Sequence, residues 1–374
     1  MKILHLITRM DRGGSAVNTL LSAIEQQRVG NQVSLAYGLS VESEMSAEEH
    51  AKVDIDILIF QALGGRIMVL KKMLRSLGWH DMQAYKELKI LLNEPFDIIH
   101  THTSKTGALG RLAAIGHKGK VIHTPHGHIF HGYFGTLKTK IFIAVERYLA
   151  KKTDVLLALT RAERDDHLAL GIGREDQWQV IPSGVDIASI RQRLKTCPKG
   201  EIWDAVSVGR LVPIKGMERL IAAWAKVCEM KPKARLALVG DGEEREKLEG
   251  LVKNLGLSEA VYFVGWADPL PYLANARCFA LMSHNEGMGR VVVEAFAAGL
   301  PCVVSDVCGL RELVDDKVGH VVNADNSVEV AEAIMAMWKE NMKNETWQRA
   351  QHYSLSAMIA GLEKVYQAKK GGCQ

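Results

Sequence analysis

Short apolar runs alternate along the chain with segments in which apolar residues recur every three or four positions. The runs are continuously apolar, which is typical of parallel strands with both faces buried. The intervening segments have the spacing of helices that cover such strands. We therefore predict an α/β fold with parallel sheets covered by helices. The predicted strands include residues 3–7, 33–36, 98–99, 155–159, 205–208, 236–239, 261–264 and 302–304.

Two further segments have patterns of their own. Residues 54–59 alternate polar and apolar positions, which predicts a strand that exposes Asp54 and Asp56. Residues 65–79 carry Lys71, Lys72 and Arg75 among apolar residues at helical spacing. The second pattern is typical of a helix on an anionic membrane surface, and also of a domain helix packed on its sheet.

The chain of 374 residues is long enough for two α/β domains, each with its own core. Residues 190–203 are polar and contain four cations, a proline and a glycine, so we predict the linker there. This places an N-terminal domain at residues 1–190 and a C-terminal domain at residues 200–354. A last helical pattern spans about residues 355–370.

Composition and charge narrow the class of protein. Apolar residues make up 47% of the chain and charged residues 24%, as in soluble globular proteins. The formal net charge of +4 is too small to argue for a nucleic-acid partner. The 6 cysteines form no Cys-x-x-Cys pair, which favours reduced thiols in a cytoplasmic protein. We find no apolar window of about 18 residues, so no membrane span is expected.

The strongest chemical signal runs from Glu286 to Pro301. Glu286 and Glu294 flank the glycine-rich turn Gly287-Met288-Gly289-Arg290, and a helical pattern follows. Peptide N–H groups at a helix N-terminus suit an anionic ligand. Carboxylates beside them can accept hydrogen bonds from sugar hydroxyls. The segment therefore predicts a site for a nucleotide sugar.

This motif, Glu-x7-Glu followed by Ala and Gly-Leu-Pro, resembles the signature of the retaining glycosyltransferases of family 4, the group 1 glycosyl transferases. The resemblance implies the GT-B fold, in which two Rossmann-like domains with doubly wound parallel sheets face a central cleft. It also implies that the helix at 355–370 crosses back to the first domain. Glu286 would hold sugar hydroxyls, Glu294 the ribose, and the amides of residues 287–289 the diphosphate.

Glycines and cations after the first strand of each domain fit the same family. Gly13 and Gly14 permit close backbone approach to a phosphate, although an ordinary turn would also explain them. The resemblance implies that they face the donor diphosphate. Gly209-Arg210 and Lys215 resemble the family's cationic loop, which implies that both cations stabilise the leaving diphosphate.

Other donor contacts are expected by the same resemblance. Gly265 and Trp266 follow a strand in the region that holds the base in the family. Met288 and Arg290 depart from its usual residues, which leaves the choice of donor sugar open.

Histidines cluster at two places, His100-Thr-His102 and the segment from His123 to His131. Metal binding must be considered, but neither cluster contains a cysteine or carboxylate, and we expect no metal. Both clusters follow predicted strands, and ligands bind at the carboxyl ends of such strands. The resemblance implies that His126 reaches the donor sugar or the reaction centre. The other histidines would line the acceptor cleft or bond to backbone.

Four residues are candidates for binding the acceptor: Ser104, Lys105, His131 and Tyr133. Ser104 could cap a helix, with Thr106 as a second candidate. Lys105 and Arg111 could face an anionic acceptor or merely solvent. A glycine-aromatic loop around Tyr133 could admit a sugar or lipid chain.

Together these features predict a retaining, metal-independent transferase. It would move a sugar from a nucleotide diphosphate sugar to a glycan or lipid-linked acceptor in cell-surface polysaccharide or lipopolysaccharide synthesis. The expected location is the cytoplasm, at the inner face of the membrane if the contact with anionic lipid is real. The alternatives are a nucleotide-sugar epimerase of the same architecture and a non-catalytic sugar-nucleotide-binding protein.

Overall fold

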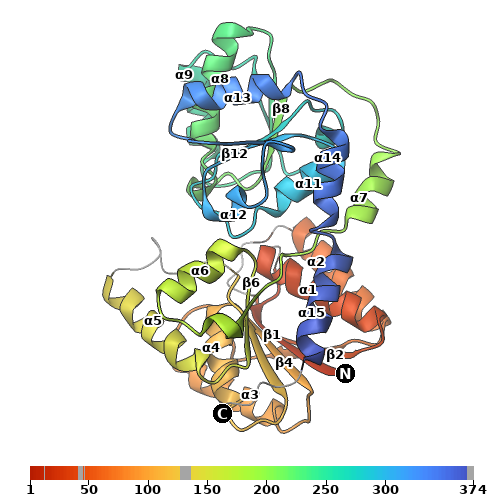
Figure 1. Cartoon of the computed structure of the whole chain (residues 1–374), viewed down its shortest axis with the longest axis vertical. Coiled ribbons are helices and arrows are strands. Elements are labelled where there is room, and N and C mark those ends of the chain that lie inside the picture. Colours follow the sequence, from red (N-terminus) through yellow and green to blue (C-terminus); the bar gives the residue numbers. More distant parts are fainter. Residues whose placement is uncertain (12, 41–44, 46, 127–135, 369–374) are drawn as a thin grey trace. The chain divides into compact units, whose positions relative to one another are not determined.

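A computed structural model describes residues 1–11, 13–40, 45, 47–126 and 136–368 of the chain (Figure 1). The chain divides into two compact units, one formed by Met1–Gly184 with Leu355–Gln374 and the other by Val185–Ser354. Each unit contains one parallel sheet with helices on its two faces, as the apolar runs predict.

The first unit contains a 7-stranded sheet in the order β3-β2-β1-β4-β5-β6-β7. Its strands are β1 (Lys2–Arg9), β2 (Gln32–Gly38), β3 (Arg66–Leu70), β4 (Ile98–His102), β5 (Lys120–Thr124), β6 (Val155–Ala158) and β7 (Trp178–Val180). Its helices are α1 (Gly14–Arg28), α2 (Ala47–Ala62), α3 (His80–Leu91), α4 (Ser104–Ala113), α5 (Thr136–Ala150), α6 (Arg161–Ala169), η1 (Glu175–Gln177) and α15 (Leu355–Gln367).

Two apolar layers enclose this sheet, and side chains alternate between them along each strand. Ile3 and Ile7 of β1 pack towards α1, whereas Leu4 and Leu6 pack on the opposite face with α3 and α4. The predicted last helix is α15, and its buried Met358, Ile359, Leu362 and Tyr366 belong to the α1 layer. Figure 1 shows α15 in dark blue beside the red α1.

The second unit contains a 6-stranded sheet in the order β10-β9-β8-β11-β12-β13. Its strands are β8 (Ala205–Val208), β9 (Leu236–Val239), β10 (Val261–Gly265), β11 (Phe279–Leu281), β12 (Cys302–Ser305) and β13 (Gly319–Val322). Its helices are α7 (Ile187–Leu194), η2 (Pro213–Lys215), α8 (Met217–Met230), α9 (Arg245–Asn254), α10 (Leu270–Ala274), α11 (Arg290–Ala298), α12 (Cys308–Arg311), α13 (Ser327–Met337) and α14 (Lys343–Gln351).

In both sheets the strand order reverses beside the first strand of the unit. The reversal lies between β1 and β4 in the first sheet and between β8 and β11 in the second. Loops that leave the carboxyl ends of two such strands separate to opposite sides, and ligands bind in the crevice that results. The two reversals therefore mark where each unit is expected to bind its ligand.

The predicted linker is wrong in detail. The division between the units falls at Gly184, and residues 187–194 form α7 in the second unit. Asp186 caps this helix by accepting a hydrogen bond from the Ser189 backbone N–H at 2.9 Å, and Ile187 is buried. The first part of the predicted linker, residues 190–194, thus belongs to a capped helix, whereas residues 195–202 contain no helix or strand.

The predicted strand at residues 54–59 is also wrong, because these residues belong to α2. Val53, Ile57 and Phe60 recur at helical spacing and pack into the core. Ile55 and Ile59, which gave the alternating pattern, remain 55% and 39% exposed.

The amphipathic helix expected at residues 65–79 is absent as well. Residues 66–70 form β3, which pairs in parallel with β2, and a turn and an irregular segment follow. Strand pairing has overridden the local helical period. Of the apolar residues in the pattern, Leu70 and Met73 are buried, whereas Leu77 and Trp79 are 71% and 87% exposed.

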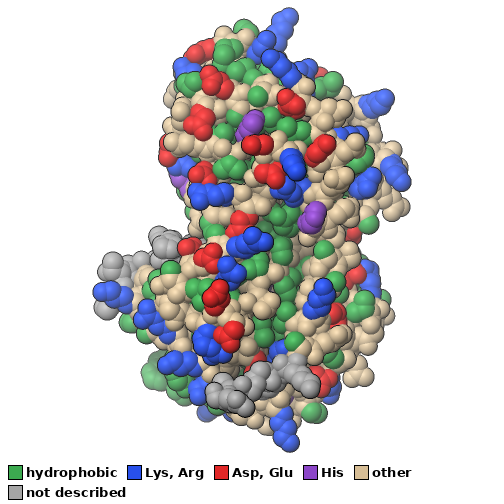
Figure 2. All heavy atoms as spheres, in the orientation of Figure 1, with side chains coloured by type: hydrophobic (Ala, Val, Ile, Leu, Met, Phe, Trp, Pro, Cys, Tyr) green, Lys and Arg blue, Asp and Glu red, His purple; other side chains and the backbone are tan. Residues whose placement is uncertain are grey.

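Charged side chains of both signs are interspersed over the face of the molecule drawn in Figure 2. Within the described residues, every helix falls short of the length or the hydropathy needed to cross a membrane.

Candidate active site

Two residues that the sequence singled out come together at the reversal of the second sheet. The Nζ of Lys215, at the end of the loop after β8, forms an ion pair with Oε1 of Glu286, in the loop after β11. Ser283 donates a hydrogen bond from Oγ to the same carboxylate oxygen at 3.0 Å. A cation and a hydroxyl therefore hold one oxygen of the Glu286 carboxylate, and among the described residues its Oε2 has no such partner.

Backbone contacts hold these two loops together. His284 donates its backbone N–H to the carbonyl of Ile214 at 2.9 Å. Gly216 has φ +60°, and a Cβ at this position would collide with the carbonyl oxygen of Met282. A Cβ on Gly309 would likewise collide with the carbonyls of Glu286 and Gly287. Glycines thus permit the loops after β8, β11 and β12 to approach each other closely.

The turn after Glu286 leads into α11, as the motif predicts. Gly289 is the N-cap residue and has φ +66°, and Met288 is buried. Gly287 has no atom within 4 Å of the place where a Cβ would stand, so its backbone is open on that side. Arg290 and Glu294 are half-buried on the first two turns of the helix. An anion at this turn would meet the positive end of the α11 dipole.

The remaining predicted donor residues lie on neighbouring loops of the same unit. Arg210 is exposed beside Gly209 and has no side-chain partner among the described residues. Gly265 ends β10 with φ +76°, and the N–H of Gly240 donates to its carbonyl at 2.9 Å. Trp266 is 54% exposed, so part of its ring is accessible to a ligand.

In the first unit, Gly13 and Gly14 lie where the sequence predicts, after β1 and at the start of α1. Both are exposed, and Gly13 is the N-cap residue. The Gly13 N–H donates to Oδ1 of Asp11 at 2.8 Å, and Arg9 forms an ion pair with the same carboxylate. The φ of Gly13 is −65°, so this turn does not depend on the conformational freedom of glycine.

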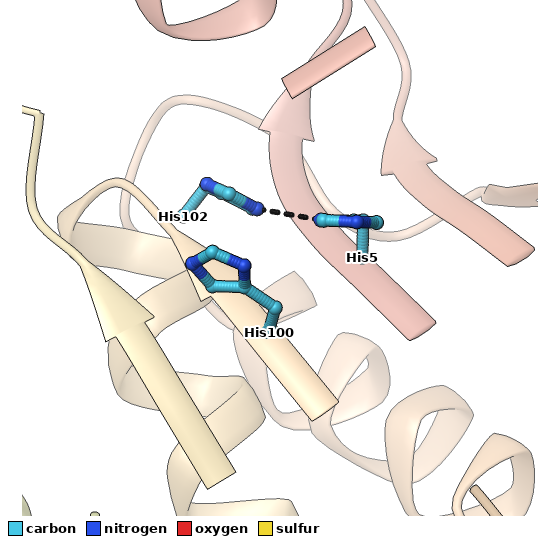
Figure 3. A group of neighbouring side chains, drawn as sticks. All are labelled: His5, His100 and His102. Carbon is cyan, nitrogen blue, oxygen red and sulfur yellow. Dashed lines mark hydrogen bonds between the residues drawn. The ribbon is translucent and has the colours of Figure 1, made fainter. Parts of the chain in front are cut away.

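Histidines of both clusters lie beside the reversal of the first sheet, where His102 contacts His100 and His126, whereas His123 bonds to Thr101. His100 and His102 lie within β4 and His123 within β5, rather than after these strands. His5 of β1, which the sequence did not single out, joins His102 through a hydrogen bond of 2.9 Å between ring nitrogens (Figure 3). His102 in turn joins His126 at 2.9 Å. Burial lowers the pKa of all these rings, that of His5 to about 4 and that of His126 to about 3.

The spacing of His5, His100 and His102 would suit a metal ion, because one nitrogen of each ring lies within 4.8 Å of the others. Both ring nitrogens of each are nevertheless already in hydrogen bonds. His5 bonds to Gln26 and His102, and His102 to His5 and His126. His100 bonds to the hydroxyls of Tyr366, at 2.6 Å, and Thr124, at 2.8 Å. The group is thus satisfied as a hydrogen-bond network.

The predicted acceptor residues have mixed outcomes. Ser104 is the first residue of α4 and makes no capping hydrogen bond, since the N-cap position belongs to Thr103. Lys105 is paired with Asp81 at 2.5 Å, so it does not simply face solvent. His131 and Tyr133 lie outside the described residues.

Arg111 faces neither acceptor nor solvent. It is wholly buried, and its Nη2 donates to both carboxylate oxygens of Glu146 at 2.7 Å.

Two family models together match nearly the whole chain. The model for Glycosyltransferase Family 4 matches residues 12–189, and that for Glycosyl transferases group 1 matches residues 191–353. The chain belongs to the family 4 glycosyltransferases.

Among curated relatives, this family 4 chain is 30% identical over 254 residues to the UDP-Gal:alpha-D-GlcNAc-diphosphoundecaprenol alpha-1,3-galactosyltransferase of Escherichia coli. That match covers 63% of this chain and 65% of the relative, so the aligned part is just under two thirds of the relative's length. A 41.2 kDa protein of the cps region of Klebsiella pneumoniae is 27% identical over 86% of this chain and 94% of its own length.

Solved structures confirm the predicted GT-B fold of this family 4 chain. HepE of Anabaena, crystallised with UDP, superimposes with a TM-score of 0.76 at 21% identity, over 99% of this chain and 100% of HepE. TarM of S. aureus superimposes with a TM-score of 0.74 at 13% identity, over 98% and 100% of the two chains.

Three features of the family 4 chain escaped prediction from the sequence. Ser283 has no motif of its own, although it lies three residues before Glu286. His5 lies inside an apolar strand, where a polar residue is itself a signal. The left-handed backbones of Thr103 and His126, both with φ +62°, have no signature in sequence. Strained backbone of this kind gathers at functional sites, and both residues lie at carboxyl ends of neighbouring strands.

Proposed function

We propose that this protein transfers a sugar from a nucleotide diphosphate sugar to a glycan or lipid-linked acceptor, with retention of anomeric configuration and without a metal ion. The cellular role would be the synthesis of a cell-surface polysaccharide or lipopolysaccharide. Membership of family 4 supports the reaction class. The names of relatives support the acceptor class, since they include the E. coli diphosphoundecaprenol galactosyltransferase and an O-antigen biosynthesis glycosyltransferase of E. coli.

The observation that carries the proposal is the contact between Lys215 and Glu286 at the reversal of the second sheet. The cation and the carboxylate lie together beside the glycine-rich turn of residues 287–289, which leads into α11. A nucleotide sugar needs this combination, because its diphosphate is anionic and its hydroxyls donate hydrogen bonds. The exposed Arg210 adds a second cation that can turn to the diphosphate.

The proposed chemistry is a displacement on one face of the sugar. The C1–O bond to the diphosphate breaks while a C1–O bond to the acceptor hydroxyl forms on the same face. The proton of that hydroxyl passes to the departing diphosphate oxygen. Lys215, Arg210 and the amides of residues 287–289 stabilise the charge that develops on the diphosphate. Glu286 holds sugar hydroxyls, and Glu294 holds the ribose.

A carboxylate nucleophile is not required in this scheme. A double displacement of the hydrolase type would need two carboxylates about 5 Å apart on opposite sides of the bond. Oε1 of Glu286 is instead occupied by Lys215 and Ser283, which makes it a poor nucleophile and a good hydrogen-bond acceptor. No metal is needed in the proposed site, because two cationic side chains supply the positive charge.

A lipid-linked acceptor would be met at the inner face of the membrane. The segment after β3 supports this location, although it is irregular and not the helix that the sequence predicts. Leu77 and Trp79 are exposed in a short irregular segment together with Lys71, Lys72 and Arg75. An anionic lipid surface attracts the cationic side chains, and the exposed apolar side chains can insert among the lipids.

The test begins with a thermal-shift screen against a panel of nucleotide sugars that includes UDP-galactose and UDP-glucose. A true donor should raise the melting temperature in proportion to its binding. The donor found is then incubated with a lipid-linked glycan acceptor, and NMR reads the anomeric configuration of the product. Retention is expected. An inverted product would contradict the mechanism, and conversion of the nucleotide sugar without any acceptor would favour an epimerase.

A further inference from the structure

A line of four side chains joined by hydrogen bonds runs through the first unit. Oε1 of Gln26, on α1, lies 2.7 Å from Nε2 of His5. Nδ1 of His5 lies 2.9 Å from Nε2 of His102, and Nδ1 of His102 lies 2.9 Å from Nε2 of His126. We call these four residues the histidine relay. It connects the core face of α1 with the carboxyl end of β5.

The interior of the relay is closed to water. Gln26 and His5 are completely buried, and His102 is 1% exposed. They lie among the apolar side chains that α1 and α15 press onto β1 and β4. Figure 3 shows the His5 ring on β1 meeting the His102 ring from β4. Burial keeps the three imidazoles of the relay uncharged, as their lowered pKa values indicate.

An uncharged imidazole has one nitrogen that donates and one that accepts. In each nitrogen–nitrogen contact of the relay, one ring must therefore donate and the other accept. If Gln26 accepts from Nε2–H of His5, then Nδ1 of His5 accepts from Nε2–H of His102. By the same rule Nδ1 of His102 accepts from Nε2–H of His126. The group at one end thus determines the tautomer at the other.

The Gln26 carbonyl oxygen faces His5 in the structure, which gives Gln26 the accepting role, and its amide Nε2 is buried without a hydrogen-bond partner among the described residues. A reversed amide would place a proton on Nδ1 of every ring and leave His126 a donor. The fourth neighbouring ring does not compete, since His100 bonds to Tyr366 and Thr124 instead.

The outer end of the relay is placed for contact with a ligand. Among the described residues, Nδ1 of His126 has no hydrogen-bond partner, and the residue is only partly buried. Its backbone has φ +62°, a conformation that is strained for a non-glycine residue and that gathers at functional sites. Thr103, at the end of the adjacent β4, is strained in the same way.

We propose that Gln26, His5 and His102 are positioning residues that lock His126 as the Nε2–H tautomer, so that its Nδ1 accepts a hydrogen bond from a substrate hydroxyl. The inference rests on the proposed function for the identity of that substrate, a sugar or its acceptor. His126 then acts through a lone pair and not as a cation. In the other tautomer, Nδ1 of His126 carries a proton and cannot accept a hydrogen bond from the substrate hydroxyl.

The protein labelled with ¹⁵N-histidine tests the tautomer directly. Two-dimensional proton–nitrogen spectra distinguish protonated from bare ring nitrogens, and single His→Gln variants assign the signals. We expect His5, His102 and His126 all to carry the proton on Nε2 at neutral pH. A proton on Nδ1 of His126, or a ring bound to metal, would overturn the proposal. This measurement needs no substrate, so it stands even if no sugar transfer is found.

A matched pair of variants on α1 tests the role of Gln26. Gln26→Met keeps the size of the side chain and removes the acceptor, so the His126 signals should become those of mixed tautomers and kcat/KM should fall roughly tenfold. Ser22→Ala is the control, because Ser22 is buried one turn earlier and bonds to the Asn18 carbonyl. It should change neither readout. If Gln26→Met lowers only the melting temperature and leaves the His126 tautomer intact, Gln26 is merely structural. If the tautomer shifts and transfer is unaffected, the role towards substrate is wrong.

Discussion

The Nζ of Lys215 and the carboxylate of Glu286 form an ion pair although the residues lie 71 positions apart in the chain. One follows β8 and the other follows β11, the two strands between which the sheet order reverses. Their side chains are 20% and 11% exposed, so the pair is partly screened from water yet reachable by a ligand. A diphosphate that approaches Lys215 would weaken its hold on Glu286 and release the carboxylate to sugar hydroxyls.

Lys215→Ala and Glu286→Gln should each lower kcat by about 10²-fold, the scale seen when one preorganised charge-stabilising group is removed. The reason is the loss of leaving-group stabilisation in the first variant and of sugar positioning in the second. Steady-state transfer assays with the donor identified by thermal shift measure both. Lys226→Ala, which removes an exposed cation of α8 paired with Glu229, should retain the parental rate.

The double variant distinguishes a shared role from two separate ones. If Lys215 and Glu286 act as a unit, removing both should cost little more than the worse single change. Turnover like that of the parent protein in both single variants would contradict the proposed site.

Much of the fold and the position of the loops that form the candidate site were predictable because local signals agreed with the tertiary structure. Glycines and charges after buried strands predicted the loops that carry Arg210, Lys215 and Glu286, since parallel strands bring their carboxyl ends to one edge. Ser283 was not predictable, because a lone serine has no pattern. Of the histidine relay, the sequence indicated His102 and His126. His5 was missed because only the pairing of β1 with β4 brings it to His100 and His102.

The failures arose where two periods compete. Residues 54–59 alternate like a strand but fold as part of α2, because Val53, Ile57 and Phe60 provide a better buried stripe. Residues 65–79 carry a helical period, yet residues 66–70 extend the sheet beside β2. Local spacing cannot show which neighbour will be present to cover an apolar face.

The buried ion pair between Arg111 and Glu146 should be essential for stability rather than for substrate binding. Glu146→Ala leaves a wholly buried guanidinium without its partner, and we expect a loss of about 3 kcal/mol or more in the free energy of unfolding. Urea denaturation measures it. Glu94→Ala, which breaks the exposed pair with Arg66, is the control and should cost less than about 1 kcal/mol. If Glu146→Ala loses as little stability as Glu94→Ala does, Arg111 must find another partner in the folded chain.

Trp79 and Leu77 should mediate binding to anionic membranes. Trp79→Ala with Leu77→Ser removes the exposed apolar tips and leaves the neighbouring cations in place. Sedimentation with vesicles of phosphatidylglycerol and phosphatidylcholine at low salt should show strong loss of binding. Trp266→Ala removes an exposed tryptophan from the other unit and should bind as the parent does. Failure of the parent protein to sediment at all would refute the membrane contact.

Removal of metal ions should leave transfer unchanged. The positive charge that the proposed site directs at the diphosphate comes from Lys215 and Arg210, and His5, His100 and His102 already bond to protein groups. Dialysis against EDTA followed by the transfer assay tests this, with added Mg²⁺ or Mn²⁺ as the comparison. A rate that falls with EDTA and returns with either ion would contradict metal independence.

Stability should fall as the pH falls below about 6.5, the pKa of an unperturbed histidine. Burial lowers the pKa of His5 to about 4 and lowers those of His100, His102 and His123 well below the usual value. Between the lowered pKa values and 6.5, the histidines bind protons in the unfolded chain and remain uncharged in the folded chain. Each such histidine therefore removes up to about 1.4 kcal/mol of stability per pH unit in this window, and the contribution is fully present above it.

Urea denaturation at pH 7.5 and 5.5 measures the effect, and the stability of the parent protein should be clearly lower at pH 5.5. His123→Gln removes one buried ring and should flatten this dependence, whereas His50→Gln changes an exposed histidine of α2 and should not. A stability that is constant or rises towards pH 5.5 would mean that the folded chain binds protons on these rings at least as readily as the unfolded chain does. Protonated rings could not donate and accept in turn along the relay, so the same measurement also bears on the tautomer of His126.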